Sequence, residues 1–185
     1  KVAVNFGEPI FLDRVLDGAV PDWRASRGDD ERPDWLPPVV DALSERILDE
    51  INRAAHVKAV ALLAIALLAT PKHAMAERDL LLQLALMREL LVRVPYSGRV
   101  TITDMSPEQM IAHGERMEVL TRTAHPLGDV LSYAGDCGVV QSYYRNNILH
   151  LFAAAGWVAC CFQNNRRMSR AGVVRLGRLV YPFIP

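Results

Sequence analysis

Apolar side chains recur every three or four positions along much of the chain, and this spacing restricts what it can fold into. Leu80, Leu84, Met87 and Leu91 show the pattern most clearly. At 3.6 residues per turn these four share one face of a helix, which we expect to span about 77–93 and to stop before Pro95. Similar stripes predict helices after residue 38, after Ser106, over about 139–162 and after Ser169. The chain is therefore predicted to be mainly helical.

Two helix starts carry capping signals. The run Ser106-Pro107-Glu108-Gln109 places a capping serine before a proline in the first turn, and Gln109 can complete a capping box. Ser169 is expected to cap the last helix in the same way. Residues 39–70 contain no glycine or proline, so the sequence leaves open whether they form one helix or two. A short strand is expected at about 129–133.

The first residues of the chain show the alternating pattern of a strand and not helical spacing. Val2, Val4 and Phe6 alternate with smaller or polar residues up to a Gly-Glu-Pro run, which is typical of a strand. One short strand needs neighbours, and nothing nearby supplies them. We therefore expect residues 1–9 to be the last strand of an upstream α/β domain. Residues 10–38, with Pro and Trp, then form a connector, and residues 39–185 form a bundle-like helical region.

Charge is unevenly distributed along the chain. Apolar residues make up 51% and charged residues 23%, as in a soluble globular domain, and the formal net charge is zero. Asp136 is the last acidic residue. Residues 137–185 contain six arginines and no lysine, so they carry +6 and the first 136 residues carry −6. This asymmetry indicates either an anionic partner for the basic part or packing of the two parts against each other.

Sequence motifs typical of catalytic or ligand-binding sites are scarce. There is no phosphate-binding glycine loop, nucleophile elbow or zinc-protease motif, and the three cysteines lack metal-ligand spacing. We therefore predict no metal and no cofactor. Arg145, Asn146 and His150 form the best polar cluster, one turn apart on a helix whose second half is apolar all round. Such a wedge is expected to be structural, holding a neighbouring loop, and touching a ligand is the alternative.

Several short motifs resemble those of the bacterial membrane-bound glycerol-3-phosphate 1-O-acyltransferases, in the same order and at similar spacing. They are Val4–Pro9, Val20–Arg24, Arg32–Leu36, Val94–Ser97 and Tyr143–Ile148. The resemblance implies a segment that begins at the last strand of the acyltransferase domain and continues into the C-terminal helical region. It also implies a parent enzyme that transfers an acyl group from acyl-CoA or acyl carrier protein to glycerol 3-phosphate, the first step of phospholipid synthesis.

The family's general base is a histidine followed five residues later by an aspartate, which can orient and charge-stabilise the imidazole. Five residues after the five histidines come Ala61, Arg78, Glu118, Val130 and Ala155. The nearest case, His113 and Glu118, would lie about 140° apart on a continuous helix. We therefore assign no catalytic residue to this chain and expect the segment alone to be inactive.

The resemblance also implies a peripheral location on the cytoplasmic face of the bacterial inner membrane. Within that interpretation Arg166, Arg167 and Arg170 are candidates for contact with anionic lipid or phosphate. Nucleic acid is not an expected partner, because the net charge is zero and the basic part lacks lysine. The alternative function is a helical interaction or nucleic-acid-binding module, which a salt-dependent gel shift would reveal.

Overall fold

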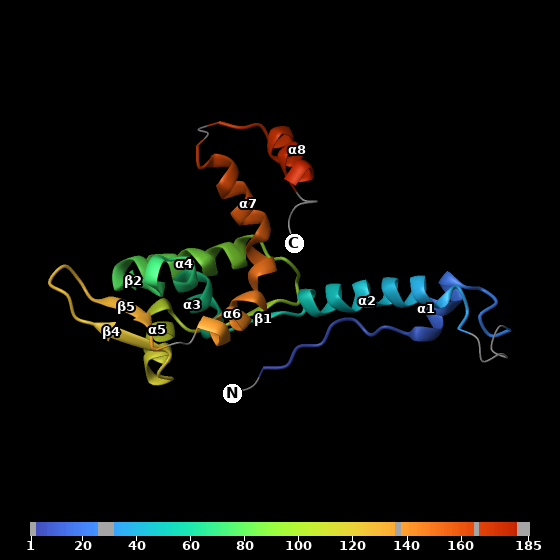
Figure 1. Cartoon of the computed structure of the whole chain (residues 1–185), viewed down its shortest axis with the longest axis horizontal. Helices are drawn as coiled ribbons and strands as arrows, with labels where there is room; N and C mark the ends of the chain where they lie inside the picture. The colour runs from blue at the N-terminus through green and yellow to red at the C-terminus, as the bar shows by residue number, and fades with distance from the viewer. Residues whose placement is uncertain (1–2, 26–31, 136–137, 165–166, 181–185) are drawn as a thin grey trace. The chain divides into compact units, whose positions relative to one another are not determined.

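The computed structural model describes residues 3–25, 32–135, 138–164 and 167–180. Figure 1 shows a mainly helical chain, as the sequence predicts, with eight α-helices and short strands in this described part. The chain divides into two compact units. Unit 1 comprises Lys1–His56 and Ser97–Thr101, and unit 2 comprises Val57–Tyr96 and Ile102–Pro185.

Unit 1 contains two helices, α1 (Leu12–Ala19) and α2 (Leu36–Arg53). The predicted connector therefore includes a helix, and its last prolines begin the next one, because proline in the first turn loses no hydrogen bond. Trp23 and Trp35 are half-buried, and the Trp23 indole donates a hydrogen bond to Asp17 (2.8 Å). The acidic run at residues 29–31 lies outside the described residues.

Ala3–Pro9 show no regular secondary structure, so the described residues give the predicted N-terminal strand no partner strand. Side chains hold this segment in place of a strand ladder. The Asn5 amide donates to the Ala54 carbonyl (3.0 Å) and to the Thr101 hydroxyl (2.8 Å), and the Glu8 backbone N–H donates to the Glu50 carboxylate (2.7 Å). An alternating pattern forms a strand only beside another strand. The assignment of residues 1–9 to an upstream domain stays a prediction.

Residues 39–70 form two helices. After α2 ends at Arg53, a short strand β1 (His56–Val57) separates it from α3 (Ala59–Leu68), and β1 pairs with β3 (Thr101–Ile102). Helix α3 is apolar on every face, and Leu62, Leu63 and Leu67 are fully buried. A helix with no polar face must be surrounded by other elements, so α3 forms the centre of unit 2.

Two helices that pack against α3 follow the sequence prediction closely. Helix α4 spans Glu77–Arg93, and all four members of its predicted stripe are buried. Helix α5 (Pro107–Arg116) begins with the predicted capping box: the Ser106 hydroxyl accepts from the Gln109 N–H (3.3 Å), and the Gln109 side chain accepts from the Ser106 N–H (2.8 Å). Met110 is buried, but α5 ends before Met117, which is exposed.

A small antiparallel sheet lies within unit 2. Its order is β2 (Ala74–Ala76), β5 (Val130–Tyr133) and β4 (Leu120–Thr123), so β5 is the central strand. In register, Ala74 lies opposite Ser132 and Leu120 lies opposite Tyr133. The short strand expected at about 129–133 is confirmed. A one-turn 3₁₀ helix, η1 (Pro71–His73), joins α3 to β2.

The long helix predicted over 139–162 is wrong. The chain forms α6 (Gly138–Asn146), a 3₁₀ turn η2 (Leu149–Phe152) and α7 (Ala153–Phe162). The break tightens the backbone, with the Ile148 N–H bonded to the Arg145 carbonyl (3.2 Å), and it buries Ile148 almost completely. Burial of this side chain against the core outweighs the helical bonds that a continuous helix would keep.

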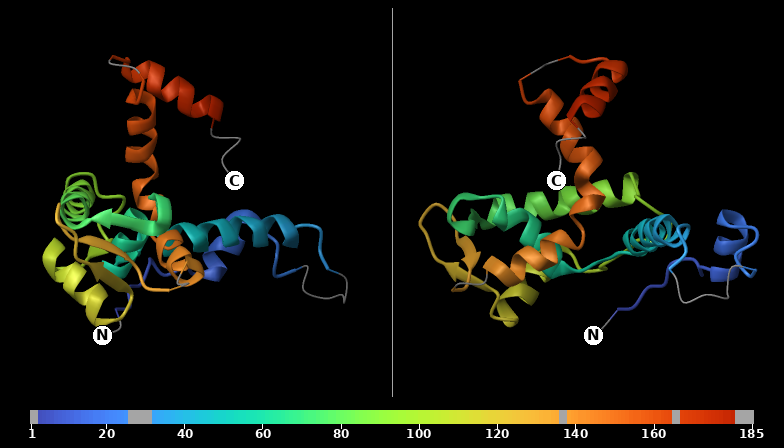
Figure 2. Two further views of the ribbon diagram at one scale, coloured as in Figure 1. Left: turned by 60° about the vertical axis from the view of Figure 1, so that its left-hand side comes forward. Right: turned by 45° about the vertical axis from the view of Figure 1, so that its right-hand side comes forward.

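The last helix, α8 (Arg170–Val180), follows α7 at the end of the described chain (Figure 2). Its predicted cap is confirmed, since the Ser169 hydroxyl accepts from the Gly172 N–H (3.1 Å). Of its apolar side chains Val173 is half-buried, whereas Leu176 and Val180 are exposed. In the described ranges no helix combines the length and hydropathy needed to cross a bilayer, and the wholly apolar α7 has only 10 residues.

Candidate functional site

The strongest electrostatic cluster of unit 2 is centred on Arg122 of β4. Its guanidinium contacts Glu77 at the start of α4 (2.7 Å), Glu115 of α5 (2.7 Å) and Asp129 before β5 (3.0 Å). These carboxylates raise the pKa of Arg122 further above its usual value, Glu77 first, then Glu115 and Asp129. A cation held by three carboxylates cannot supply or accept a proton near neutral pH. We interpret this cluster as a structural clamp between the sheet and two helices.

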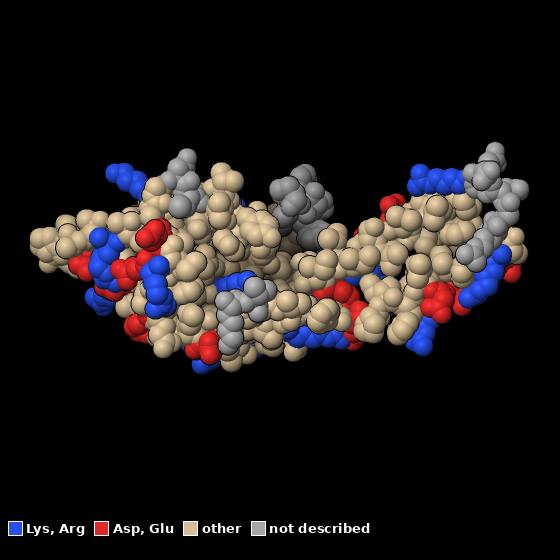
Figure 3. Space-filling model, turned by 90° about the horizontal axis from the view of Figure 1, so that it is seen from below, with Lys and Arg blue, Asp and Glu red and all other residues tan. Residues whose placement is uncertain are grey.

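Sequence spacing gives no hint of this clamp, because its four members lie on separate elements up to 52 positions apart. Only the fold brings Glu77 and Asp129 together, and the Glu77 backbone N–H also donates to the Asp129 carbonyl (2.8 Å). On the face drawn in Figure 3, acidic and basic side chains lie in mixed groups. Charged side chains of the described residues are therefore partly paired with one another.

The structure divides the predicted polar cluster. Arg145 and Asn146, at the end of α6, contact each other through a hydrogen bond from Nε to Oδ1 (3.1 Å). His150 lies beyond the helix break in η2, where its ring meets Tyr96 edge to face at a centroid distance of 5.1 Å. Because the predicted helix is broken between them, the three residues no longer follow one another along a helical face.

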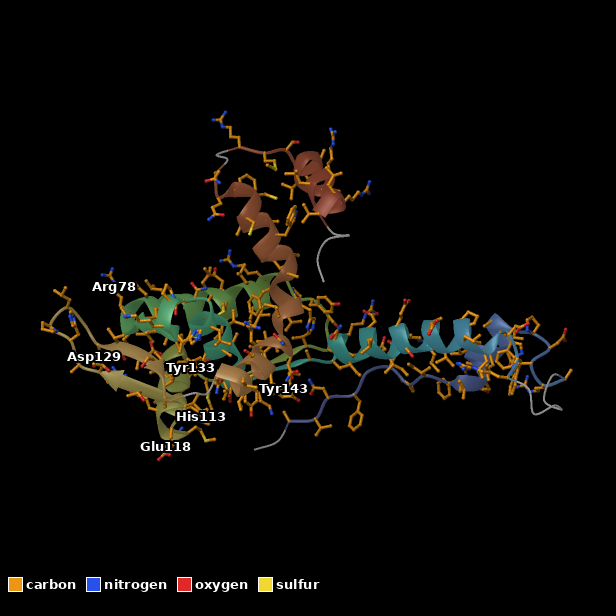
Figure 4. The ribbon with its side chains drawn as sticks, in the orientation of Figure 1. Arg78, His113, Glu118, Asp129, Tyr133 and Tyr143 are labelled. Carbon is orange, nitrogen blue, oxygen red and sulfur yellow. The ribbon has the colours of Figure 1, made fainter. Side chains whose placement is uncertain are left out.

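The nearest approach to the family's catalytic pattern is also disrupted. His113 lies in the last turn of α5 and its Nδ1 is 3.5 Å from Arg116, whereas Glu118 lies in the turn after the helix with a positive φ of 57°. Figure 4 labels both residues and shows Glu118 pointing away from the ribbon. His125 accepts a hydrogen bond from the Leu127 N–H (3.2 Å) in a loop. Neither histidine hydrogen-bonds a carboxylate within the described residues.

No group of three or more metal-ligating side chains comes together in the part of the chain that the structure describes. The carboxyl groups whose pKa is lowered lie at or near the surface. The Glu8 backbone N–H, followed by the charge of Arg99, lowers the pKa of Glu50. Hydrogen bonds from Trp23 and then Arg24 lower the pKa of Asp17. These contacts stabilise the charged carboxylates. A carboxyl group that acts as a general acid has a raised pKa instead.

The basic C-terminal part gathers three arginines on one helix. Arg170, Arg175 and Arg178 are exposed on α8 and line an open hollow of about 790 Å³ together with Ala171, Val174 and Leu179. Of the predicted lipid-contacting residues, Arg170 belongs to this face, Arg167 is exposed before the helix, and Arg166 lies outside the described residues. Sequence reasoning missed Arg175 and Arg178, although their spacing from Arg170 places all three on one half of the helix.

One edge of α8 packs against α7. The Trp157 indole donates to the Val173 carbonyl (3.3 Å), and a Cβ at Gly177 would lie 3.3 Å from the Trp157 Nε1. Glycine is therefore suited to position 177 because it lets the two helices approach. This contact covers only part of α8 and leaves its three arginines exposed.

Comparison with known proteins gives a consistent result. Residues 1–185 match the family described as the glycerol-3-phosphate acyltransferase C-terminal region. The whole chain is 59% identical to the glycerol-3-phosphate acyltransferase of Xanthomonas axonopodis pv. citri (strain 306) and 54% identical to that of Xylella fastidiosa (strain M23), and it covers 21% of each. It is 40% identical to that of Pseudomonas fluorescens (strain SBW25), of which it covers 22%.

The chain thus spans about one fifth of the length of these curated relatives. The match extends over every residue, including the short motifs that carry the resemblance. This chain belongs to the glycerol-3-phosphate acyltransferase C-terminal region family.

Proposed function

We propose that this chain is the non-catalytic C-terminal region of an enzyme that acylates the 1-hydroxyl of glycerol 3-phosphate. The hydroxyl oxygen attacks the thioester carbon of acyl-CoA or acyl carrier protein, an ester forms, and the carrier thiol leaves with the proton. The observation that carries the proposal is the family match over the entire chain. It is supported by the sequence, in which no histidine is followed five residues later by an aspartate.

In this function the chain acts as a scaffold. Its apolar helix α3 packs against α4, α5 and α6, and the Arg122 clamp ties the sheet to α4 and α5. Such a unit can present a fixed surface to the rest of the polypeptide, which would hold the base and the substrate-binding residues. No step of acyl transfer needs a side chain of this region.

A thiol-release assay of the full-length protein with glycerol 3-phosphate tests the enzymatic part of the proposal. We expect 1-acylglycerol 3-phosphate with acyl-CoA, with acyl carrier protein, or with both, and no turnover by residues 1–185 alone. Absence of product from the full-length protein with either donor would refute the assignment. Turnover by the isolated chain would show that the catalytic groups lie here.

We further propose that the protein is peripheral on the cytoplasmic face of the inner membrane, where Arg166, Arg167 and Arg170 contact anionic lipid. Support comes from the six arginines and the absence of acidic residues after Asp136. Changing these three arginines to Glu in the full-length protein should reduce its co-sedimentation with vesicles that contain phosphatidylglycerol. Unchanged sedimentation would reject this contact.

A further inference from the structure

We infer that the arginine side of α8 is a preformed interfacial surface that lies along an anionic bilayer, with Arg170, Arg175 and Arg178 at the headgroups. This inference rests on the proposed membrane association and goes further by specifying a helix, an orientation and two residues, Arg175 and Arg178, that the sequence did not single out. In this inference the lipid-binding arginines share one face of a helix and are not simply neighbours in the sequence.

The first argument is charge. The three arginines have no acidic side chain near them in sequence, because residues 138–180 contain no Asp or Glu. Within the described residues none of the three forms an ion pair, in contrast to Arg99 and Arg122, which contact two and three carboxylates. Unpaired guanidinium groups on one face form the charge pattern that an anionic surface attracts.

The second argument is the composition of that face. Val174 and Leu179 line the same open hollow as the arginines, and they are 47% and 60% exposed. Alternation of cationic and apolar side chains suits the headgroup region of a bilayer, where arginines bind phosphates and short apolar side chains reach the acyl boundary. An acidic protein surface would satisfy the arginines but would leave these two apolar side chains against polar groups.

The third argument is orientation. Gly177 and the Val173 carbonyl contact Trp157 of α7, so α7 covers one edge of α8 and leaves the three arginines exposed. The adjacent α7 also exposes Val158 and Phe162, and Cys161 is its one buried residue in the described structure. The pair α7–α8 therefore presents apolar and basic side chains without a compensating carboxylate.

The test compares full-length protein variants in sedimentation with vesicles of equal parts phosphatidylglycerol and phosphatidylcholine. Each arginine near an anionic surface is worth about 1 kcal/mol, so Arg175→Gln with Arg178→Gln should lower the partition coefficient about thirtyfold. The matched control, Arg78→Gln with Arg116→Gln, changes two exposed arginines of α4 and α5 and should leave binding within about twofold. Replacing Val174 and Leu179 by Ser should weaken binding further.

The possible outcomes distinguish the inference about α8 from the proposed membrane association and from the proposed enzymatic function. If the wild type binds these vesicles and the α8 variant binds equally well, the inference is wrong while the membrane proposal survives. If the wild type does not bind vesicles, and the α8 arginines are instead required for binding acidic carrier protein, the partner class is wrong. Acyl transfer by each variant in detergent micelles serves as the folding control, and its absence in the wild type refutes the proposed function itself.

Discussion

Arg122 shows how one side chain organises several elements of unit 2. Its three carboxylate partners come from the start of α4, from α5 and from the segment before β5, and each pair is about one-third exposed. A single exposed pair contributes little, but removal of the shared cation leaves Glu77, Glu115 and Asp129 repelling one another.

We expect Arg122→Met to lower the free energy of unfolding by about 1–3 kcal/mol at neutral pH. The loss should shrink in acid, because protonation of the three carboxyl groups removes their repulsion. Chemical denaturation at both pH values measures this difference. Arg116→Met, at an exposed position of α5, is the control and should change stability by no more than about 0.5 kcal/mol. Equal effects of the two substitutions would contradict the clamp.

Glu50 provides a pH-dependent test in unit 1. The Glu8 N–H and Arg99 lower the pKa of its carboxyl, so the folded state binds protons less readily than the unfolded state does. Its contribution is fully present above about pH 4.3, the ordinary glutamate pKa, and is lost as the pH falls through the lower folded-state value. Glu50→Gln should therefore lose less stability on acidification than the wild type does. Glu45→Gln on the same helix should behave as the wild type, and an identical acid response of all three proteins would disprove the coupling.

At the scale of elements, the close approach of α5 to its neighbours depends on Gly114. A Cβ there would lie 2.8 Å from the Leu120 Cδ1 and 3.1 Å from the Leu63 Cδ1. We expect Gly114→Ala to destabilise the protein by about 1–3 kcal/mol, because both leucines are tightly packed.

Gly156→Ala is the matched control for this overpacking. Gly156 lies in α7, and a methyl group there would enter open space, since beyond its chain neighbours and the backbone of its own helix nothing lies within 4 Å of the position that its Cβ would take. Alanine there should stabilise the helix by about 0.5–1 kcal/mol through its lower conformational entropy in the unfolded chain. Opposite signs in thermal denaturation support the packing argument, and a gain in stability at both glycines would reject it.

The elements that could be predicted from the sequence are those in which the capping residues, prolines and apolar spacing agree with the burial of the side chains. Helix α4 has one apolar stripe and a following proline, and α5 has a complete capping box, so both were located correctly. The break between α6 and α7 has no glycine or proline to mark it, and burial of Ile148 decides it. Along α2, Val40 and Ile47 recur at helical spacing, yet both are more than 40% exposed, because burial depends on neighbours that periodicity does not reveal.

The candidate site was predictable only in part, for a similar reason. The concentration of arginine after Asp136 is visible in composition, and it pointed to Arg166, Arg167 and Arg170. The edge of α8 that Trp157 covers is set by a tertiary contact. The Arg122 clamp likewise depends on the order of strands in the sheet. Neither contact leaves a periodic signal in the sequence.

For the whole molecule, the central claim is that acyl transfer needs no acid–base residue of this region. Measurement of kcat for the full-length protein, with each of the five histidines of this chain changed singly to Gln, tests it most directly. A general base contributes about a hundredfold to ten-thousandfold in rate. We expect every variant with wild-type thermal stability to keep kcat within about threefold of the wild type. A loss of about a hundredfold in any stably folded variant would contradict the account.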